Sequence, residues 1–340
     1  MNKFPEWVEQ FYVPHDRVFS AYSSNGIDWK RDKGVRLEKN KFNPFDGSFY
    51  CFIHQPDDLH GLYELFYHAS VQKQDRWVSH IIQCTSLDLK NWNSHKNFIL
   101  SSDQLNNGLT QIRAPFLKKV NGFWRLYFTA KSTDGIPGIY SAISTSREKW
   151  EIEPGMRISS SMCMEETTSN EIVGVSDTSI IDLPDGSYRM YFSVYRGSIF
   201  KQNICSATSI DGLHWRIEPG IRLNFGSEGC RLIVNNPSVI KINGLWNMFF
   251  RGSNNMPIKD KIFRAVSDDS LEWNIIEPVI SPNPYNLKER HEVAHPFVFK
   301  TNEGIYRMFY TGCGGTILDR FAYKYYEEQY KKMGISILYD

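Results

Sequence analysis

Three short hydrophobic or aromatic motifs recur in the same order along the chain, at a spacing of roughly 60 residues. The first is a short apolar segment, found in FDGSFYCFI, RAPFLKKV, SDTSIIDL, NPSVIKI and HPFVFK. The second is an aromatic segment centred on Phe66, Tyr127, Tyr191, Phe249 and Phe309. The third is a Ser-containing polar turn that ends in Trp29, Trp92, Trp150, Trp215 and Trp273. Because the motifs stay in register through five copies, they define an internal repeat.

Each repeat predicts four β-strands. Turns such as PDG at 184–186 and NG at 121–122 and 243–244 join the first two segments as a hairpin. Segments such as IYSAIST, NICSATS and IFRAVSD supply a third strand, and a fourth follows each Trp. Four antiparallel strands in about 60 residues are typical of a propeller blade. We therefore predict an all-β fold, a five-bladed β-propeller of four-stranded antiparallel blades.

The repeat also predicts how the chain is divided. All 340 residues form a single domain, 1–340, although length alone would favour two. The blades are expected at approximately 45–95, 110–152, 174–217, 233–276, and 291–340 completed by 16–32. Residues 18–32 would complete the blade begun by 294–312, closing the ring by pairing the two chain ends. The C-terminal GISILYD could take the same strand position.

Composition agrees with this fold and excludes several functions. Aromatic residues make up 14% of the chain and there are nine alanines, which argues against a helical bundle. The net charge of +1 lacks the basic footprint of a nucleic-acid binder. No apolar stretch has the length of a signal peptide or membrane span, so we expect a cytoplasmic protein without membrane contact. The six cysteines form no C-x-x-C pair and are expected to be free and mostly buried.

The topology predicts where a functional pocket would lie. In a propeller the first strand of each blade is nearest the axis, and long loops on one face of a rigid scaffold usually carry binding. Polar residues at the starts of these strands are Asp46, Arg113, Asp177, Asn236 and His295. Those at the ends of the second strands are His68, Lys131, Arg196, Arg251 and Cys313. We expect these two groups to converge at one mouth of the central channel.

These blades resemble the clan of five-bladed glycosidases that includes arabinanases, β-xylosidases, levansucrases and invertases. The resemblance rests on the S-x-D-G-x-x-W turns, on FSVYRG followed by NICSATSIDGLHW, and on NNPSVIKINGLW paired with HEVAHPFVFKTNEGIYRMFYTG. It covers essentially the whole chain and is closest to uncharacterised bacterial members. It implies three acidic residues on the first strands of successive blades, acting as base or nucleophile, as a tuning group and as general acid.

The match to these acidic positions is incomplete. Asp46 in FNPFDGSFY fits the first, but the second blade offers Arg113. The third blade offers Asp177 in place of Glu, with Glu171 on the preceding loop. Asp46 with Asp177 or Glu292 could form the acid/base pair.

The basic residues point to the charge of the ligand. Arg113, Arg196 and Arg251 favour a carboxylate or phosphate, because the arginine fork matches such anions. His68 and His295 could shuttle protons or only donate hydrogen bonds. Lys131 and Asn236 complete the expected binding residues.

Residues 291–295 read HEVAH, which formally matches the H-E-x-x-H signature of zinc proteases. That chemistry needs a helix, whereas Pro296 follows at once and then a strand-like FVFK. We therefore expect a strand here and assign no metal.

One insertion stands outside the repeat. Residues 316–334 follow TGCGG, and Glu327 and Glu328 precede Lys331 and Lys332 by helical spacing. This segment could be a lid, a subunit interface or a peripheral loop.

The sequence thus favours a glycoside hydrolase-like enzyme without a cofactor. We expect it to act on a small carbohydrate, neutral or anionic, or on an anionic metabolite, by acid/base chemistry of carboxylates. Its catalytic candidates are Asp46, Asp177 and Glu292. Two alternatives stay open. One is a propeller enzyme of diverged chemistry, such as a cyclase, alkyl transferase or lyase, and the other is a non-catalytic sugar-binding module.

Overall fold

The structure is a computed structural model, and most of its regular elements are β-strands. It describes residues 15–38, 50–58, 60–73, 76–103, 105, 108–166, 172–197, 201–227, 229–253 and 260–314. Within these ranges the single helix is α2 (Ser160–Glu166), which lies in the long loop between two sheets. The described part of the chain is therefore all-β, as predicted from the repeat.

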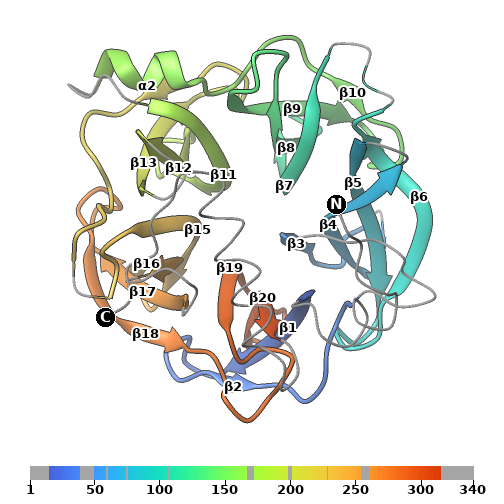
Figure 1. Cartoon of the computed structure of the whole chain (residues 1–340), viewed down its shortest axis with the longest axis vertical. Helices are drawn as coiled ribbons and strands as arrows, with labels where there is room; N and C mark the ends of the chain where they lie inside the picture. Colours follow the sequence, from blue (N-terminus) through green and yellow to red (C-terminus); the bar gives the residue numbers. More distant parts are fainter. Residues whose placement is uncertain are drawn as a thin grey trace, which may run out of the picture.

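The strands form antiparallel four-stranded sheets that follow one another around a common centre (Figure 1). One sheet consists of β3 (Cys51–His54), β4 (Tyr63–Lys73), β5 (Arg76–Ser86) and β6 (Asn93–Ser101). The next consists of β7 (Thr110–Val120), β8 (Phe123–Lys131), β9 (Pro137–Ser144) and β10 (Glu151–Ile152). In each, chain order and spatial order agree, as in a meander.

The next eight strands are hydrogen-bonded into one sheet, but its two halves are connected only by a single parallel residue pair, Gln202 with Ile233. The halves are β11 (Ile172–Asp182), β12 (Tyr188–Arg196), β13 (Gln202–Ser209) and β14 (Arg216–Ile217), and β15 (Ile233–Ile242), β16 (Leu245–Ser253), β17 (Lys261–Ser267) and β18 (Asn274–Ile280). Each half repeats the four-strand order of the other sheets.

The last sheet joins segments from both ends of the described chain. Its spatial order is β19 (Glu292–Lys300), β20 (Tyr306–Gly314), β1 (His15–Ser23) and β2 (Lys30–Arg31). All nine residues of β1 pair with β20, from His15 opposite Gly314 to Ser23 opposite Tyr306. Most of β1 and all of β2 fall within the segment 18–32 that the repeat assigns to this sheet. The 316–334 insertion and GISILYD lie outside the described residues.

The turn tryptophans pack between neighbouring sheets, as their spacing predicts. Trp215 meets Tyr127 edge-on with ring centroids 6.1 Å apart, and Trp273 meets Tyr191 in the same way at 5.7 Å. Trp29 on Phe249 and Trp92 on Phe309 repeat this geometry. Each aromatic belongs to the second strand of one sheet and each Trp to the turn of the next. This edge-to-face contact adds to the apolar area that the rings bury.

Hydrogen bonds lock the same junctions. The buried hydroxyl of Tyr127 donates to the carbonyl oxygen of Gly212 at 2.7 Å, and that of Tyr191 donates to Ser270 at 2.6 Å. The turns themselves are held by side chains, for example by Ser209 Oγ, which accepts from the Gly212 N–H at 2.8 Å. The sheets are thus fixed to one another at their outer turns.

Two further sequence predictions concern cysteines and membranes. None of the six cysteines forms a disulfide; five are buried and Cys313 is partly buried, as expected. Among the described residues, no helix has the length and apolar character needed to span a membrane.

The Tyr191 hydrogen bond can be tested by Tyr191→Phe. Removing the hydroxyl leaves the buried Ser270 carbonyl unpaired, so we expect the free energy of unfolding to fall by about 1 kcal/mol in urea titrations. Tyr285→Phe is the control, because Tyr285 is 95% exposed. Equal stability of the two variants would contradict a stabilising role for this junction.

Candidate functional site

The innermost strands share one irregularity at the same place. Sheet pairings align Phe52, Phe116, Ser179, Ser238 and Phe297 opposite the aromatic centres of the second strands. Two residues earlier in each strand stand Tyr50, Ala114, Asp177, Asn236 and His295. Four of these, Ala114, Asp177, Asn236 and His295, adopt left-handed backbone conformations with φ between 51° and 54°.

A β-bulge causes this conformation. Register shifts occur between Arg113 and Phe116, Ser176 and Thr178, Asn235 and Ser238, and Ala294 and Phe297. A bulge inserts an extra residue, bends the strand and redirects a side chain. Positive φ is uncommon for residues other than glycine, and such conformations cluster at functional sites.

The bulged residues line a pocket of about 40 Å³. All five innermost strands or their starts contribute to its wall. The lining residues are Tyr50, Cys51, Ala114, Pro115, Phe116, Asp177, Thr178, Asn236, Pro237, His295, Pro296 and Phe297. The pocket therefore lies where the five inner strands converge, the place that topology predicts for a site.

Several polar atoms around this pocket are buried without a hydrogen-bonding partner among the described protein groups. They are Asp177 Oδ1, Thr178 Oγ1, both amide atoms of Asn236 and both ring nitrogens of His295. All four residues are at most 8% exposed. Such atoms cost free energy unless something satisfies them, and in native proteins they are usually paired. Six unpaired atoms around one pocket indicate a site built to bind a polar ligand.

A chain of hydrogen bonds orients Asp177. Its Oδ2 accepts from Ser176 Oγ at 2.8 Å, and Ser176 Oγ lies 2.6 Å from the Tyr195 hydroxyl. Arg113 Nη2 in turn donates to that hydroxyl at 3.0 Å. Burial raises the pKa of Asp177, although the charge of Arg113 opposes the shift. Asp177 is thereby suited to donate a proton.

His295 faces the opposite electrostatic situation. Its ring centroid lies 3.7 Å from that of Tyr50, and burial holds its pKa well below the usual value, with further lowering by the charges of Arg251 and Arg113. His295 is therefore neutral near pH 7, with one nitrogen free to donate and the other to accept. It suits hydrogen bonding to hydroxyl groups.

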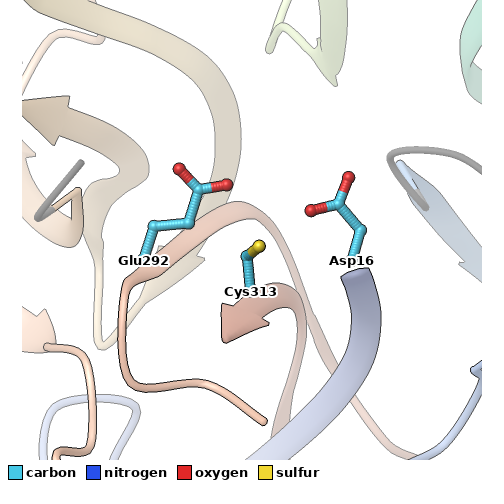
Figure 2. A group of neighbouring side chains, drawn as sticks. All are labelled: Asp16, Glu292 and Cys313. Carbon is cyan, nitrogen blue, oxygen red and sulfur yellow. The ribbon is translucent and has the colours of Figure 1, made fainter. Parts of the chain in front are cut away.

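A second polar cluster lies beside the pocket, at the joined ends of β1, β19 and β20. Figure 2 shows Asp16, Glu292 and Cys313 pointing toward one another. Their donor atoms all lie within 4.8 Å of one another, because Asp16 and Glu292 both stand opposite Cys313 in the sheet. Two carboxylates and a thiolate could in principle bind a divalent cation.

Burial and the neighbouring carboxylates favour a proton on this cluster. Arg251, held by an ion pair with Asp260, places Nη2 4.0 Å from Glu292 Oε2 and supplies positive charge. Burial holds the pKa of Cys313 well above its usual value, with Asp16 and Glu292 adding to the shift, which disfavours the thiolate. Burial also raises the pKa of Glu292 to about 8; Asp260 and Asp16 add to this and Arg251 opposes it. The cluster therefore holds a proton at neutral pH.

The structure brings together only part of the site expected from sequence. Asp177, Asn236 and His295 line the pocket, and Arg113, Arg251 and Glu292 lie next to it. Arg113 is one residue out of register, since the bulge places Ala114 at the wall. Asp46 and Glu171 lie outside the described residues, and Tyr50 takes the corresponding wall position of the first inner strand.

The residues predicted at the ends of the second strands occupy different positions relative to the aromatic centres of those strands. His68 and Arg251 each stand two residues after the aromatic centre of their strand. His68 Nε2 lies 3.2 Å from Ser70 Oγ. Lys131 and Cys313 stand two residues later. Arg196, at the end of β12, interacts with Asn203 of β13, its Nε donating to Asn203 Oδ1 at 3.4 Å. His68 and Arg251 lie near the pocket, because the His68 ring is 6.1 Å from that of Tyr50 and the charges of both residues act on His295. Arg196 is directed along its own sheet.

The HEVAH segment is not helical. Strand β19 begins at Glu292, so His295 reaches the pocket while the His291 N–H donates to the Cys313 carbonyl at 3.0 Å. The strand predicted from Pro296 is confirmed, and the zinc-protease interpretation is excluded.

Sequence reasoning missed Tyr50, Tyr195, Asp16 and the bulges. A signal for three bulges was present, because Ala114, Asn236 and His295 each precede a proline inside an otherwise strand-like segment. Proline within an inner strand is confined to bulges or edges. No comparable signal marked Asp16, whose partners come from the other end of the chain.

The raised pKa of Glu292 predicts a pH-dependent stability. The folded state binds this proton more tightly than the unfolded state, so the contribution is full below about pH 4.5 and is lost as the pH rises toward 8. We expect Glu292→Gln to lose less stability than the wild type between pH 5 and 8, by about 1 kcal/mol or more.

Denaturant titrations at several pH values would measure this difference. Glu272→Gln, at an exposed turn position, is the control and should follow the wild-type curve. Parallel curves for Glu292→Gln and the wild type would show that this carboxyl group titrates normally.

Comparison with known proteins identifies the fold. No protein-family model matches the chain, and no curated protein matches it. Solved structures do match. A thermostable family-43 glycoside hydrolase is 16% identical with a TM-score of 0.62, covering 80% of this chain and 91% of that one. The endo-arabinase from Bacteroides thetaiotaomicron VPI-5482 is 15% identical with a TM-score of 0.59, covering 79% and 93%.

A third match is the GH43_1 enzyme from Xanthomonas citri, solved in complex with xylose. It is 13% identical with a TM-score of 0.54, covering 78% of this chain and 86% of that one. At such identities the likeness concerns architecture. The chain shares the β-propeller fold of family-43 glycoside hydrolases, the fold class that its repeats predict.

Proposed function

We propose that the protein is a glycoside hydrolase-like enzyme that binds a small carbohydrate in the central pocket and acts on it by acid/base chemistry. The observation that carries the proposal is the set of buried, unpaired polar atoms around a carboxyl group of raised pKa. Sugar hydroxyls both donate and accept, so Asn236 and His295 suit them. The shared fold supports the proposal, as do the related Xanthomonas citri structures with xylose and xylotriose.

The proposal includes a closed, five-bladed ring. Its support is the pairing of β1 with β20 and the single-pair link between the β11–β14 and β15–β18 halves, which separates the strands into five four-stranded groups. Closure would hold the five inner strands at fixed distances from the axis. A rigid pocket of this kind positions a substrate against its acid.

Asp177 is assigned the role of general acid. Hydrolysis of a glycosidic bond needs one group that protonates the leaving oxygen and another that activates water or attacks the sugar carbon. Asp177 is protonated more readily than an ordinary aspartate, and its Oδ1 carries no hydrogen bond from the described protein groups. Asp46, four residues before Tyr50, is proposed as the base or nucleophile on the strength of the sequence. Glu292 is the alternative acid.

One observation favours a second function. Asp177 is the only carboxyl group among the described residues that line the pocket, whereas hydrolysis uses two. A sugar-binding module without catalysis would need only the hydrogen-bonding wall.

Asp177→Asn separates the two functions. For the enzyme, we expect hydrolysis of aryl glycosides to fall by at least about 100-fold while sugar binding persists, because the amide cannot donate a carboxyl proton. Asp182→Asn is a matched control from the same strand, with a side chain that is 71% exposed. Wild-type binding of sugars without turnover of any glycoside would favour the binding module.

A further inference from the structure

We propose that the sugar bound in the central pocket carries an anionic group, a carboxylate or phosphate, and that Arg113 is its main partner, with Lys131 as a second cation. This inference rests on the proposed function for the location of the ligand. It concerns which sugars the pocket selects and does not depend on turnover.

Arg113 differs from most other arginines inside the fold, although Arg196 and Arg264 also donate to neutral groups, the side-chain amides of Asn203 and Asn247. Those that pair with a carboxylate include Arg125 with Glu153, Arg189 with Glu218, Arg251 with Asp260, Arg307 with Asp32, and Arg147 with Asp57 and Glu64. Arg157 and Arg222 instead donate to backbone carbonyl oxygens. The hydrogen bond that Arg113 makes is to one neutral hydroxyl, that of Tyr195.

No described carboxylate lies within ion-pairing distance of the Arg113 guanidinium, although the charge of Asp177 acts on it from further away. Asp177, the nearest acid in its hydrogen-bond chain, accepts from Ser176 and not from Arg113. Partly burying a charge without a counter-ion is costly, and removing it from water must be offset by a partner. Four of its five N–H donors are left for a ligand.

Arg113 also lies at the pocket. It directly precedes Ala114, which forms part of the wall, and it reaches Asp177 through Tyr195 and Ser176. Its positive charge influences the pKa of Tyr50, Asp177 and His295, all of which line the pocket. An anion bound to Arg113 would thus sit beside the hydrogen-bonding wall.

Lys131 adds a second positive charge nearby. It ends β8, the strand that pairs with the strand of Arg113, and no ion pair involves its amine among the described residues. Burial lowers its pKa, and the charge of Arg113 lowers it further, so the two cations lie close enough to repel. An anion between them would relieve this repulsion.

The chemistry of the ligand follows from the combination of these two cations with the uncharged polar groups of the pocket wall. An arginine fork binds the two oxygens of a carboxylate or phosphate with parallel hydrogen bonds. The neutral His295 and Asn236 suit ring hydroxyls. A uronic acid and a sugar phosphate share this chemistry, and binding measurements can tell them apart.

Isothermal titration calorimetry with three probes tests the proposal: methyl β-glucuronide, glucose 6-phosphate and methyl β-glucoside. We expect at least one anionic probe to bind about tenfold or more tightly than the neutral glucoside. The stronger of the two anions identifies the class. Arg113→Gln and Lys131→Gln should each reduce this preference, and Arg113→Gln should abolish most of it.

Arg216→Gln and Lys30→Gln are the matched controls, since both side chains lie on exposed outer strands. They should keep the wild-type preference. Thermal unfolding of Arg113→Gln checks that the variant folds, because the substitution removes the hydrogen bond to Tyr195. If that variant does not fold, Arg113→Lys serves instead, and it should keep the charge but weaken anion binding through loss of the fork.

The proposal is wrong if neither anionic probe binds more tightly than methyl β-glucoside, or if Arg113→Gln keeps the wild-type preference. Failure of the proposed function would look different. In that case anions would still bind through Arg113, while no glycoside would be hydrolysed and Asp177→Asn would change no rate.

Discussion

The left-handed bulge on the inner strands is the constraint on which the site depends. It takes one residue out of the ladder in four of the five inner strands and turns it toward the centre, so that Asp177, Asn236 and His295 line one pocket. The freed backbone N–H groups are used between sheets. That of Asp177 donates to Thr129 Oγ1 and that of Asn236 to Ser193 Oγ, both at 3.1 Å. The same irregularity thus shapes the pocket and ties adjacent sheets together.

Such backbone conformations are unfavourable by about 1–3 kcal/mol each and persist only where the surroundings enforce them. Here the surroundings are rigid. Aromatic second strands, exemplified by the fully buried Tyr127 and Tyr191, pack against the turn tryptophans of the next sheet and donate hydrogen bonds to its turn. Strain at the centre is therefore offset by packing further out, which leaves the inner side chains oriented for a ligand.

Burial decides the protonation of the groups that converge at the centre. It raises the pKa of Asp177 and Glu292 and lowers that of His295, so both acids bind a proton more readily than usual while the imidazole stays neutral. Arginine charges modulate these shifts. Arg251 forms an ion pair with Asp260, whereas no described carboxylate forms one with Arg113. The electrostatic character of the pocket thus depends on which of the nearby arginines form ion pairs with carboxylates.

The sequence by itself determined the strands, their repeat and the role of the turn tryptophans, because these follow from local patterns of apolar residues and turn chemistry. It also pointed to Asp177, Asn236 and His295. Only the tertiary structure placed Ala114 instead of Arg113 at the wall, and only it joined Asp16 to Glu292 and Cys313. A bulge shifts register by one residue, and pairing between β1 and β20 unites distant segments. Both depend on contacts between strands, which no single stretch of sequence contains.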